Sequence, residues 1–123
     1  MKFTKLVPNI FYTDIQIGLQ LFVDCLEFEI GYNGLDDAEP CCVVQKDELA
    51  VFLHQSREFA EKDRPEIRLQ TPAITEVHAK IKSVRPEWLH PNLPEVKMRP
   101  WGALEFAIVD ASGVCVIIQQ WDR

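Results

Sequence analysis

Hydrophobic and polar residues in the first half of the chain follow a pattern that predicts a strand, a helix and three further strands. Residues 5–12 form a strand-like run, and Asp14 stands where its side chain can cap a helix. The apolar residues of this helix recur at three- and four-residue spacing: Ile15, Leu19, Phe22 and Leu26. Strand-like runs follow over residues 28–32, 41–45 and 49–54. The first half therefore predicts a β-α-β-β-β unit.

The second half repeats this order of elements. A short strand is expected over residues 67–71, and Pro72 can set the first turn of a helix. The inner face of this helix is expected to carry Ile74, Val77, Ile81 and Val84. Three more strands are expected over residues 96–99, 104–109 and 114–121. The chain is therefore expected to contain two stacked copies of one supersecondary unit.

These patterns predict a single domain over residues 1–123, built from modules at about 1–56 and 66–123. A length of 123 residues is typical of one domain, and 47% hydrophobic residues are sufficient for a core. The residues between the modules, 57–65, are mostly charged. We expect them to form a solvent-exposed linker.

The net charge and the spacing of the cysteines indicate which class of partner and which cellular compartment to expect. Thirteen basic and nineteen acidic residues give a net charge of −6, which argues against nucleic acid as a partner. No apolar run approaches the roughly 18 residues of a membrane span, and no signal-peptide core is apparent. The four cysteines lack a C-x-x-C pair and lie in apolar segments, as reduced buried thiols do. We expect a soluble cytoplasmic protein with a neutral or cationic small-molecule ligand.

Two segments resemble a known superfamily. Residues 14–32, DIQIGLQLFVDCLEFEIGY, resemble the D-x-x-x-(A/S)-x-x-F-Y-x-x-x-L-G-F-x-x-x-Y segment of the glyoxalase, bleomycin-resistance and extradiol-dioxygenase superfamily, the vicinal oxygen chelate proteins. Residues 99–113, RPWGALEFAIVDASG, resemble the P-W-G-x-x-E-F-x-x-x-D-P-x-G stretch of its bleomycin-resistance-like branch. Leu21, Glu27 and Ala111 replace the usual Phe, Gly and Pro.

The resemblance implies an α+β fold in which two βαβββ modules form a cup-shaped, mostly antiparallel eight-stranded sheet with helices outside. It also implies that a small ligand binds in the cup and that the protein is a homodimer. Alternate residues of a strand point to opposite faces, so the inward positions would decide what the cup binds.

The resemblance further implies four positions at which the enzymes of the superfamily hold a divalent metal ion. Two of these positions fall on Val7 and Ile117, whose hydrocarbon side chains cannot bind metal. The other two fall on Glu66 and on or near Phe52, with His54 two residues further along the same strand face. His54 and Glu66 are therefore weak metal candidates, and we expect a cup without metal or other cofactor.

Aromatic and acidic side chains remain as candidate ligand contacts. Trp101 lies between Pro100 and Gly102, and the resemblance places it at the rim of the cup. Glu105 follows four residues later and could orient a cationic or planar ligand that stacks on the indole. The full set of expected ligand contacts is Trp101, Glu105, Phe52, His54, Trp88 and Phe11.

Three classes of function remain open. The first is a metal-free binding protein of the bleomycin-resistance type that sequesters a planar or cationic ligand. The second is a metal-dependent lyase, isomerase or thiol transferase of the same superfamily. The third is a protein-interaction or dimerisation domain without a small ligand. No general-base pair supports catalysis, since His78 is expected on a helix surface and His90 has no recognisable partner.

Overall fold

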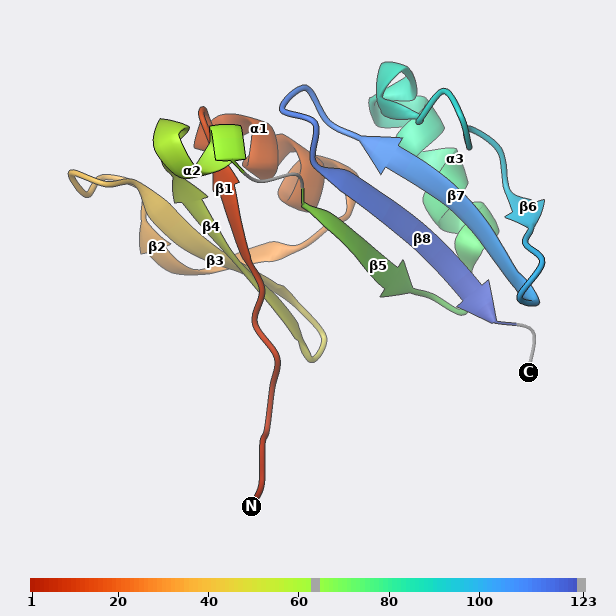
Figure 1. Cartoon of the computed structure of the whole chain (residues 1–123), viewed down its shortest axis with the longest axis horizontal. Helices are drawn as coiled ribbons and strands as arrows, with labels where there is room; N and C mark the ends of the chain where they lie inside the picture. Colours follow the sequence, from red (N-terminus) through yellow and green to blue (C-terminus); the bar gives the residue numbers. More distant parts are fainter. Residues whose placement is uncertain (63–64, 122–123) are drawn as a thin grey trace. The chain divides into compact units, whose positions relative to one another are not determined.

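The computed structural model describes residues 1–62 and 65–121 of the chain (Figure 1). The chain divides into two compact units, Met1–Asp63 (unit 1) and Arg64–Arg123 (unit 2). The division falls inside the predicted linker, and each unit has its own four-stranded sheet. Among the described residues, no helix is long and apolar enough to cross a membrane.

Unit 1 contains a sheet with the strand order β1-β4-β3-β2, which we call sheet 1. Strands β1 and β4 pair in parallel, whereas the other two pairings are antiparallel. The elements of the unit are β1 (Asn9–Tyr12), α1 (Ile15–Leu19), the π-helix η1 (Gln20–Cys25), β2 (Glu29–Gly34), β3 (Cys41–Lys46), β4 (Leu49–Gln55) and α2 (Arg57–Lys62).

Unit 2 repeats this topology in a second sheet with the order β5-β8-β7-β6, which we call sheet 2. Strands β5 and β8 pair in parallel, and the remaining pairings are antiparallel. The elements are β5 (Glu66–Gln70), α3 (Ile74–Val84), the 3-10 helix η2 (Pro86–Trp88), β6 (Lys97–Met98), β7 (Ala103–Val109) and β8 (Cys115–Trp121). The predicted α+β class, the two βαβββ modules and the mostly antiparallel pairing are therefore confirmed, with the eight strands divided into two sheets of four.

One prediction for unit 1 is wrong. The first strand begins at Asn9, so residues 5–8 lie outside it, and Val7 is 41% exposed. The predicted linker, residues 57–65, contains helix α2, which has no buried residue. Ser56 accepts a hydrogen bond from the backbone N–H of Phe59 at 3.3 Å, and the side chains of Glu58 and Lys62 pair at 3.1 Å. A capping serine and an i,i+4 ion pair favour a helix over an irregular linker.

The core of unit 1 lies between sheet 1 and the helical segment that follows β1. Asp14 caps α1, as predicted, by accepting a hydrogen bond from the backbone N–H of Gln16 at 3.0 Å. The helix then widens into η1, where the N–H of Leu26 bonds to the carbonyl of Leu21. The fully buried side chains include Ile10, Tyr12, Leu21, Phe22, Val44 and Leu53. Alternate residues of β1 and β4 therefore point into this core.

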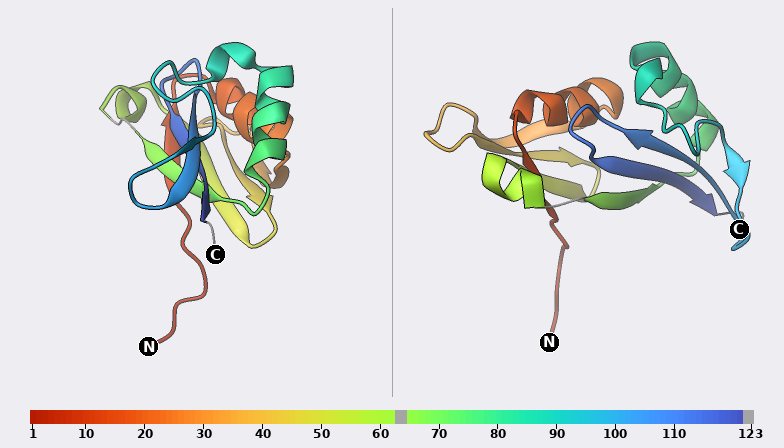
Figure 2. Two further views of the ribbon diagram at one scale, coloured as in Figure 1. Left: turned by 90° about the vertical axis from the view of Figure 1, so that its right-hand side faces the viewer. Right: turned by 45° about the horizontal axis from the view of Figure 1, so that its top comes forward.

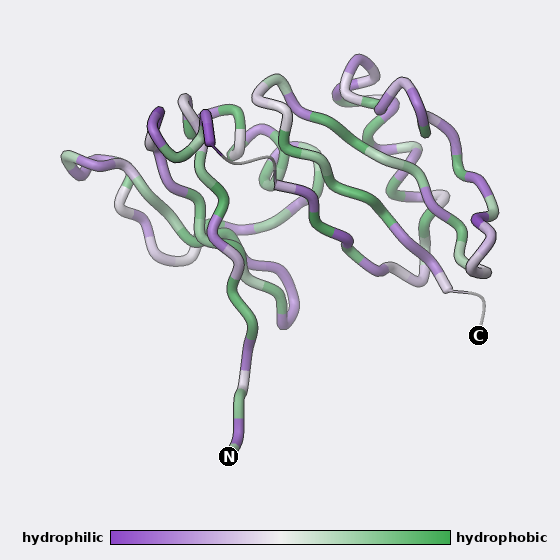
Figure 3. The backbone as a smooth tube through the Cα atoms, in the orientation of Figure 1, coloured by the Kyte–Doolittle hydropathy of each residue, from purple (hydrophilic) through white to green (hydrophobic). Residues whose placement is uncertain are grey.

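The core of unit 2 lies between α3 and one face of sheet 2 (Figure 2). Strands β7 and β8 are apolar over much of their length (Figure 3). Ile74 and Ile81 are buried as predicted, but Val84 at the end of α3 is 37% exposed. His78 does not lie free on the helix surface: its ring packs edge-on against Phe106 at 4.9 Å.

Candidate functional site

The face of sheet 1 that points away from the core carries three of the predicted ligand contacts. In β1, Ile10 is buried on the core side while Phe11 is half-buried on the opposite face. In β4, Leu53 is buried, and the half-buried Phe52 and His54 alternate with it. Phe11 lies directly opposite His54 in the parallel pairing of these strands. Strand alternation and register therefore bring these three rings to one face.

The three rings stack on one another. The ring centroids of Phe52 and His54 are 4.3 Å apart with an interplanar angle of 16°, and those of Phe11 and His54 are 5.1 Å apart at 27°. Both pairs are offset or parallel arrangements within the range of favourable aromatic contacts. The imidazole is thus held between two phenyl rings, and all three side chains retain access to solvent.

Two further aromatic side chains extend this stack, and neither was among the predicted contacts. Phe59 of α2 lies 5.1 Å from Phe11, and Tyr32 of β2 lies 6.4 Å from Phe52. Phe59 is 50% exposed and Tyr32 is 56% exposed. We call the five side chains the aromatic row; in spatial order they are Tyr32, Phe52, His54, Phe11 and Phe59.

Charged groups stand at both ends of the aromatic row. The Tyr32 hydroxyl donates to Asp37 Oδ2 at 3.4 Å, and the negative charge of Asp37 raises the pKa of this phenol. At the other end, the ammonium of Lys62 lies 5.9 Å from the centre of the Phe59 ring. The middle of the row is uncharged at neutral pH, because burial lowers the pKa of His54 from 6.5.

Unit 2 brings together the two other central predictions, Trp101 and Glu105. The indole Nε1 of Trp101 donates to Glu105 Oε2 at 3.0 Å. The same oxygen accepts a hydrogen bond of 2.6 Å from Gln119 and lies 3.5 Å from the Nε of Arg68. Glu105 is only 1% exposed, so the expectation of a carboxylate available to a cationic ligand is revised. Its charge is engaged inside unit 2, where it holds Trp101 in place.

The two tryptophans predicted as ligand contacts in unit 2 have different surroundings. Trp101 is 48% exposed, and the guanidinium of Arg99 lies over its ring at 5.2 Å. Trp88 is 7% exposed in η2, with the guanidinium of Arg85 over its ring at 5.1 Å. We therefore keep Trp101 and remove Trp88 from the candidate contacts, because a buried ring has little surface left for a ligand.

The residues at the metal positions do not fit a metal site. Val7 precedes β1, and Ile117 is a hydrocarbon side chain of β8 that is 7% exposed. His54 Nε2 is engaged with Asn9 Oδ1 at 3.0 Å, and Glu66 is an exposed residue at the start of β5. Within residues 1–62 and 65–121, no three His, Cys, Asp or Glu side chains converge on one point. A divalent ion needs such a set of nitrogen, sulfur or oxygen ligands.

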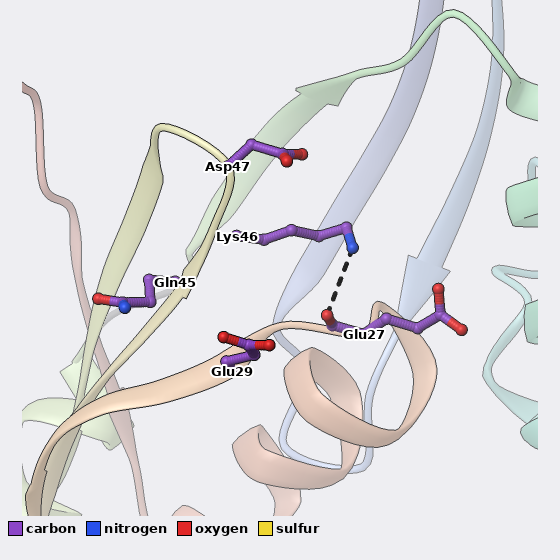
Figure 4. A pocket seen from close by; sticks show the side chains of 5 residues that line it. All are labelled: Glu27, Glu29, Gln45, Lys46 and Asp47. Carbon is purple, nitrogen blue, oxygen red and sulfur yellow. Dashed lines mark hydrogen bonds between the residues drawn. The ribbon is translucent and has the colours of Figure 1, made fainter.

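Unit 1 also has a hollow of about 330 Å³ beside the β3–β4 turn, lined by Glu27, Glu29, Gln45, Lys46 and Asp47 (Figure 4). The ammonium of Lys46 donates to the backbone carbonyl of Glu27 at 3.4 Å. None of the predicted contacts lines this hollow, and its side chains are all polar. Small-molecule sites are usually lined by apolar and aromatic groups, so we do not assign the ligand to this hollow.

Comparison with known proteins gives similarity in structure only. No protein-family model and no curated protein sequence matches the chain. A bleomycin-binding protein complexed with bleomycin is 20% identical to this chain, with a TM-score of 0.75. The match covers 96% of this chain and 98% of the bleomycin-binding protein. The bleomycin-binding protein of bleomycin-producing Streptomyces verticillus, complexed with copper(II)-bleomycin, is 19% identical to this chain with a TM-score of 0.75. This match covers 100% of this chain and 99% of that protein.

A bleomycin resistance determinant encoded on the transposon Tn5 is similar to the same degree. It has 19% identity and a TM-score of 0.74, and the match covers 97% of this chain and 98% of the determinant. The matches span nearly the whole of each protein, so they concern the elements of both units. The chain therefore has the same fold as these bleomycin-binding and bleomycin-resistance proteins, as the two sequence segments predicted.

Proposed function

We propose that this protein binds a small molecule with a planar ring system on the aromatic row and sequesters it without converting it. The observation that carries this proposal is the stacking of His54 between Phe11 and Phe52 on a partly exposed sheet face. The fold is shared with proteins solved in complex with bleomycin, which supports a ligand-binding role of the bleomycin-resistance type.

The chemistry of the row favours a flat ligand. Aromatic side chains that already stack leave ring faces and edges for another planar group, and each such contact contributes about 0.5 to 1.5 kcal/mol. Several contacts are needed, because association costs at least about 4 kcal/mol of translational and rotational freedom. A row of five aromatic side chains can supply them. Asp37 at the Tyr32 end adds a negative charge, which would favour a ligand whose cationic group lies at that end.

We propose further that the protein works as a homodimer in the cytoplasm. Large apolar side chains are exposed near the start of the chain, with Phe3 at 86% and Leu6 at 89%. Contiguous exposed apolar residues often mark contact surfaces, and burial against a second copy would remove them from water. Light scattering at micromolar concentration measures the mass directly, and a mass of one chain would contradict the homodimer.

The experiment that tests the function is a calorimetric titration with bleomycin. We expect saturable binding to the wild-type protein and about fivefold weaker binding to Phe52→Ala, because one lost stacking contact corresponds to about 1 kcal/mol. Leu49→Ala is the matched control, since Leu49 is a 45% exposed residue of the same strand outside the row. Wild-type affinity in Phe52→Ala would exclude the row as the binding surface. No heat with bleomycin or with other planar compounds would instead favour an interaction domain.

A further inference from the structure

A chain of hydrogen bonds in unit 2 connects Trp101, in the turn before β7, with Trp121 of β8. Glu105 of β7 and Gln119 of β8 lie directly opposite each other, and the Gln119 amide donates to Glu105 Oε2 at 2.6 Å. Trp101 donates to the same oxygen at 3.0 Å. The amide oxygen of Gln119 accepts from the indole of Trp121 at 2.9 Å and from Gln70 at 3.2 Å. The polar edges of both indoles are therefore turned toward the sheet.

This network explains why a carboxylate is buried in the middle of a sheet. Glu105 is 1% exposed and Gln119 is 4% exposed. Burial of a charge is costly unless hydrogen bonds and an opposite charge compensate it. Trp101 and Gln119 provide the hydrogen bonds, and Arg68 provides the opposite charge at 3.5 Å. A carboxylate compensated in this way is not a free counter-ion for a ligand.

A positive side chain lies directly against the Trp101 ring. The guanidinium of Arg99 lies over the ring at 5.2 Å, and its buried Nε has no hydrogen-bond partner within the described part of the chain. Lys97 lies opposite Glu105 in the β6–β7 pairing, whereas the charge of Arg68 is balanced by Glu105. A cation that stacked on the other face of the indole would share the ring with Arg99 and be repelled by it. An anionic group beside the indole would instead be attracted to the side chains of Arg99 and Lys97.

We propose that Glu105 is a positioning residue that holds the Trp101 indole, and that the indole selects uncharged or anionic planar rings over cationic ones. This inference rests on the proposed small-molecule function and adds the ligand class at Trp101. It replaces the expectation that Trp101 and Glu105 together bind a cation.

The selectivity can be tested with two probes of the same ring and opposite charge, 2-naphthoate and 2-naphthylmethylammonium. We expect the wild-type protein to bind 2-naphthoate at least tenfold more tightly than the ammonium probe in calorimetric titrations. Arg99→Met should abolish most of this preference, and it leaves the hydrogen bonds of Glu105 and Gln119 in place. Trp101→Ala should weaken naphthoate binding at least tenfold. Equal or tighter binding of the ammonium probe, or no binding of either probe, would overturn the selectivity.

The positioning role has a readout that needs no ligand. The Trp101 Nε1–H should exchange slowly with solvent in proton–nitrogen spectra of the wild type, because it is bonded to a buried carboxylate. Glu105→Ala should accelerate its exchange more than that of the Trp88 indole. Because Glu105→Ala could unfold unit 2, Glu105→Gln is used as a second variant of similar side-chain volume. Its neutral amide should accept a weaker hydrogen bond from Trp101 and so shift the Nε1–H signal of this residue. Unchanged exchange and shift in both variants would overturn the positioning role. The fivefold weaker bleomycin binding expected for Phe52→Ala would in that case still support the proposed function.

Discussion

The Nε2 atom of His54 lies 3.0 Å from the Oδ1 atom of Asn9, so a hydrogen bond between neighbouring strands fixes the imidazole in the aromatic row. With a carboxamide oxygen as partner, Nε2 carries the proton and Nδ1 is left as an acceptor. A neutral, oriented ring can stack between Phe11 and Phe52 without introducing a charge into the row. The Asn9 contact therefore fixes the ring orientation on which the proposed stacking of a planar ligand depends.

This environment predicts a pH dependence of stability. Burial lowers the pKa of His54 below 6.5, so the unfolded chain binds a proton more readily than the folded protein. The contribution of His54 to the free energy of unfolding should be complete above pH 6.5 and should fall as the pH drops below it, until the folded-state pKa is passed. Urea denaturation between pH 8 and 5 measures this. His54→Phe should show a weaker dependence, and identical profiles would show that His54 is not the group responsible.

The cap of α2 should control one end of the aromatic row. Ser56→Ala removes the acceptor for the Phe59 N–H, which should cost about 1 kcal/mol and fray the helix that carries this ring. We therefore expect Ser56→Ala to be less stable and to bind bleomycin a few-fold more weakly. Ser56→Asp keeps an acceptor at the cap and should restore both properties. Full affinity in Ser56→Ala would show that Phe59 does not contribute to binding.

Gly18 provides a test of the packing beneath sheet 1. An alanine in a helix is ordinarily about 1 kcal/mol more favourable than glycine. At position 18, however, a Cβ atom would lie 2.5 Å from Cε2 of Tyr12, a fully buried ring. Gly18→Ala should therefore lower the free energy of unfolding by about 1 to 3 kcal/mol. Gln16→Ala, at an exposed position of the same helix, should change it by less than about 0.5 kcal/mol. A stabilised Gly18→Ala variant would contradict this packing.

Divalent metal ions should leave the melting temperature unchanged. A ligand that binds only the folded state raises the melting temperature, and the described residues offer no converging set of three metal-binding side chains. Thermal melts with Ni²⁺, Mn²⁺ and Zn²⁺ at millimolar concentration test this expectation. A clear rise that disappears in His54→Phe would favour the metal-dependent enzyme over the binding protein.

Much of the fold could be predicted because it depends on local patterns. The cap at Asp14 and the buried positions Ile74 and Ile81 follow from periodicity and from the chemistry of helix ends. Helix α2 was not predicted, although Ser56 and the Glu58–Lys62 spacing contained a helix signal. The charged composition of this segment indicates an exposed connector but does not predict the contact of the Phe59 ring with Phe11.

The candidate site was only partly predictable, because its geometry depends on long-range pairing. A register shift between Ile30 and Asn33 in β2 brings Tyr32 to Phe52, and simple alternation along the strand does not predict this. Trp101 and Glu105 were expected to contact the same ligand because of their spacing, but the hydrogen bond between them was not predicted. The burial of Glu105 was not, because the residues that compensate its charge come from other strands of sheet 2.

The binding of a planar ligand to the aromatic row is tested most directly by nuclear magnetic resonance of the aromatic side chains during titration with bleomycin. A ring that stacks on the row should shift the His54 Hδ2 and Hε1 signals upfield, together with the ring signals of Phe52 and Phe11, and these shifts should saturate at the calorimetric affinity. Saturating shifts confined to the polar hollow around Glu29 and Lys46, with the His54 signals unmoved, would contradict the proposed binding surface.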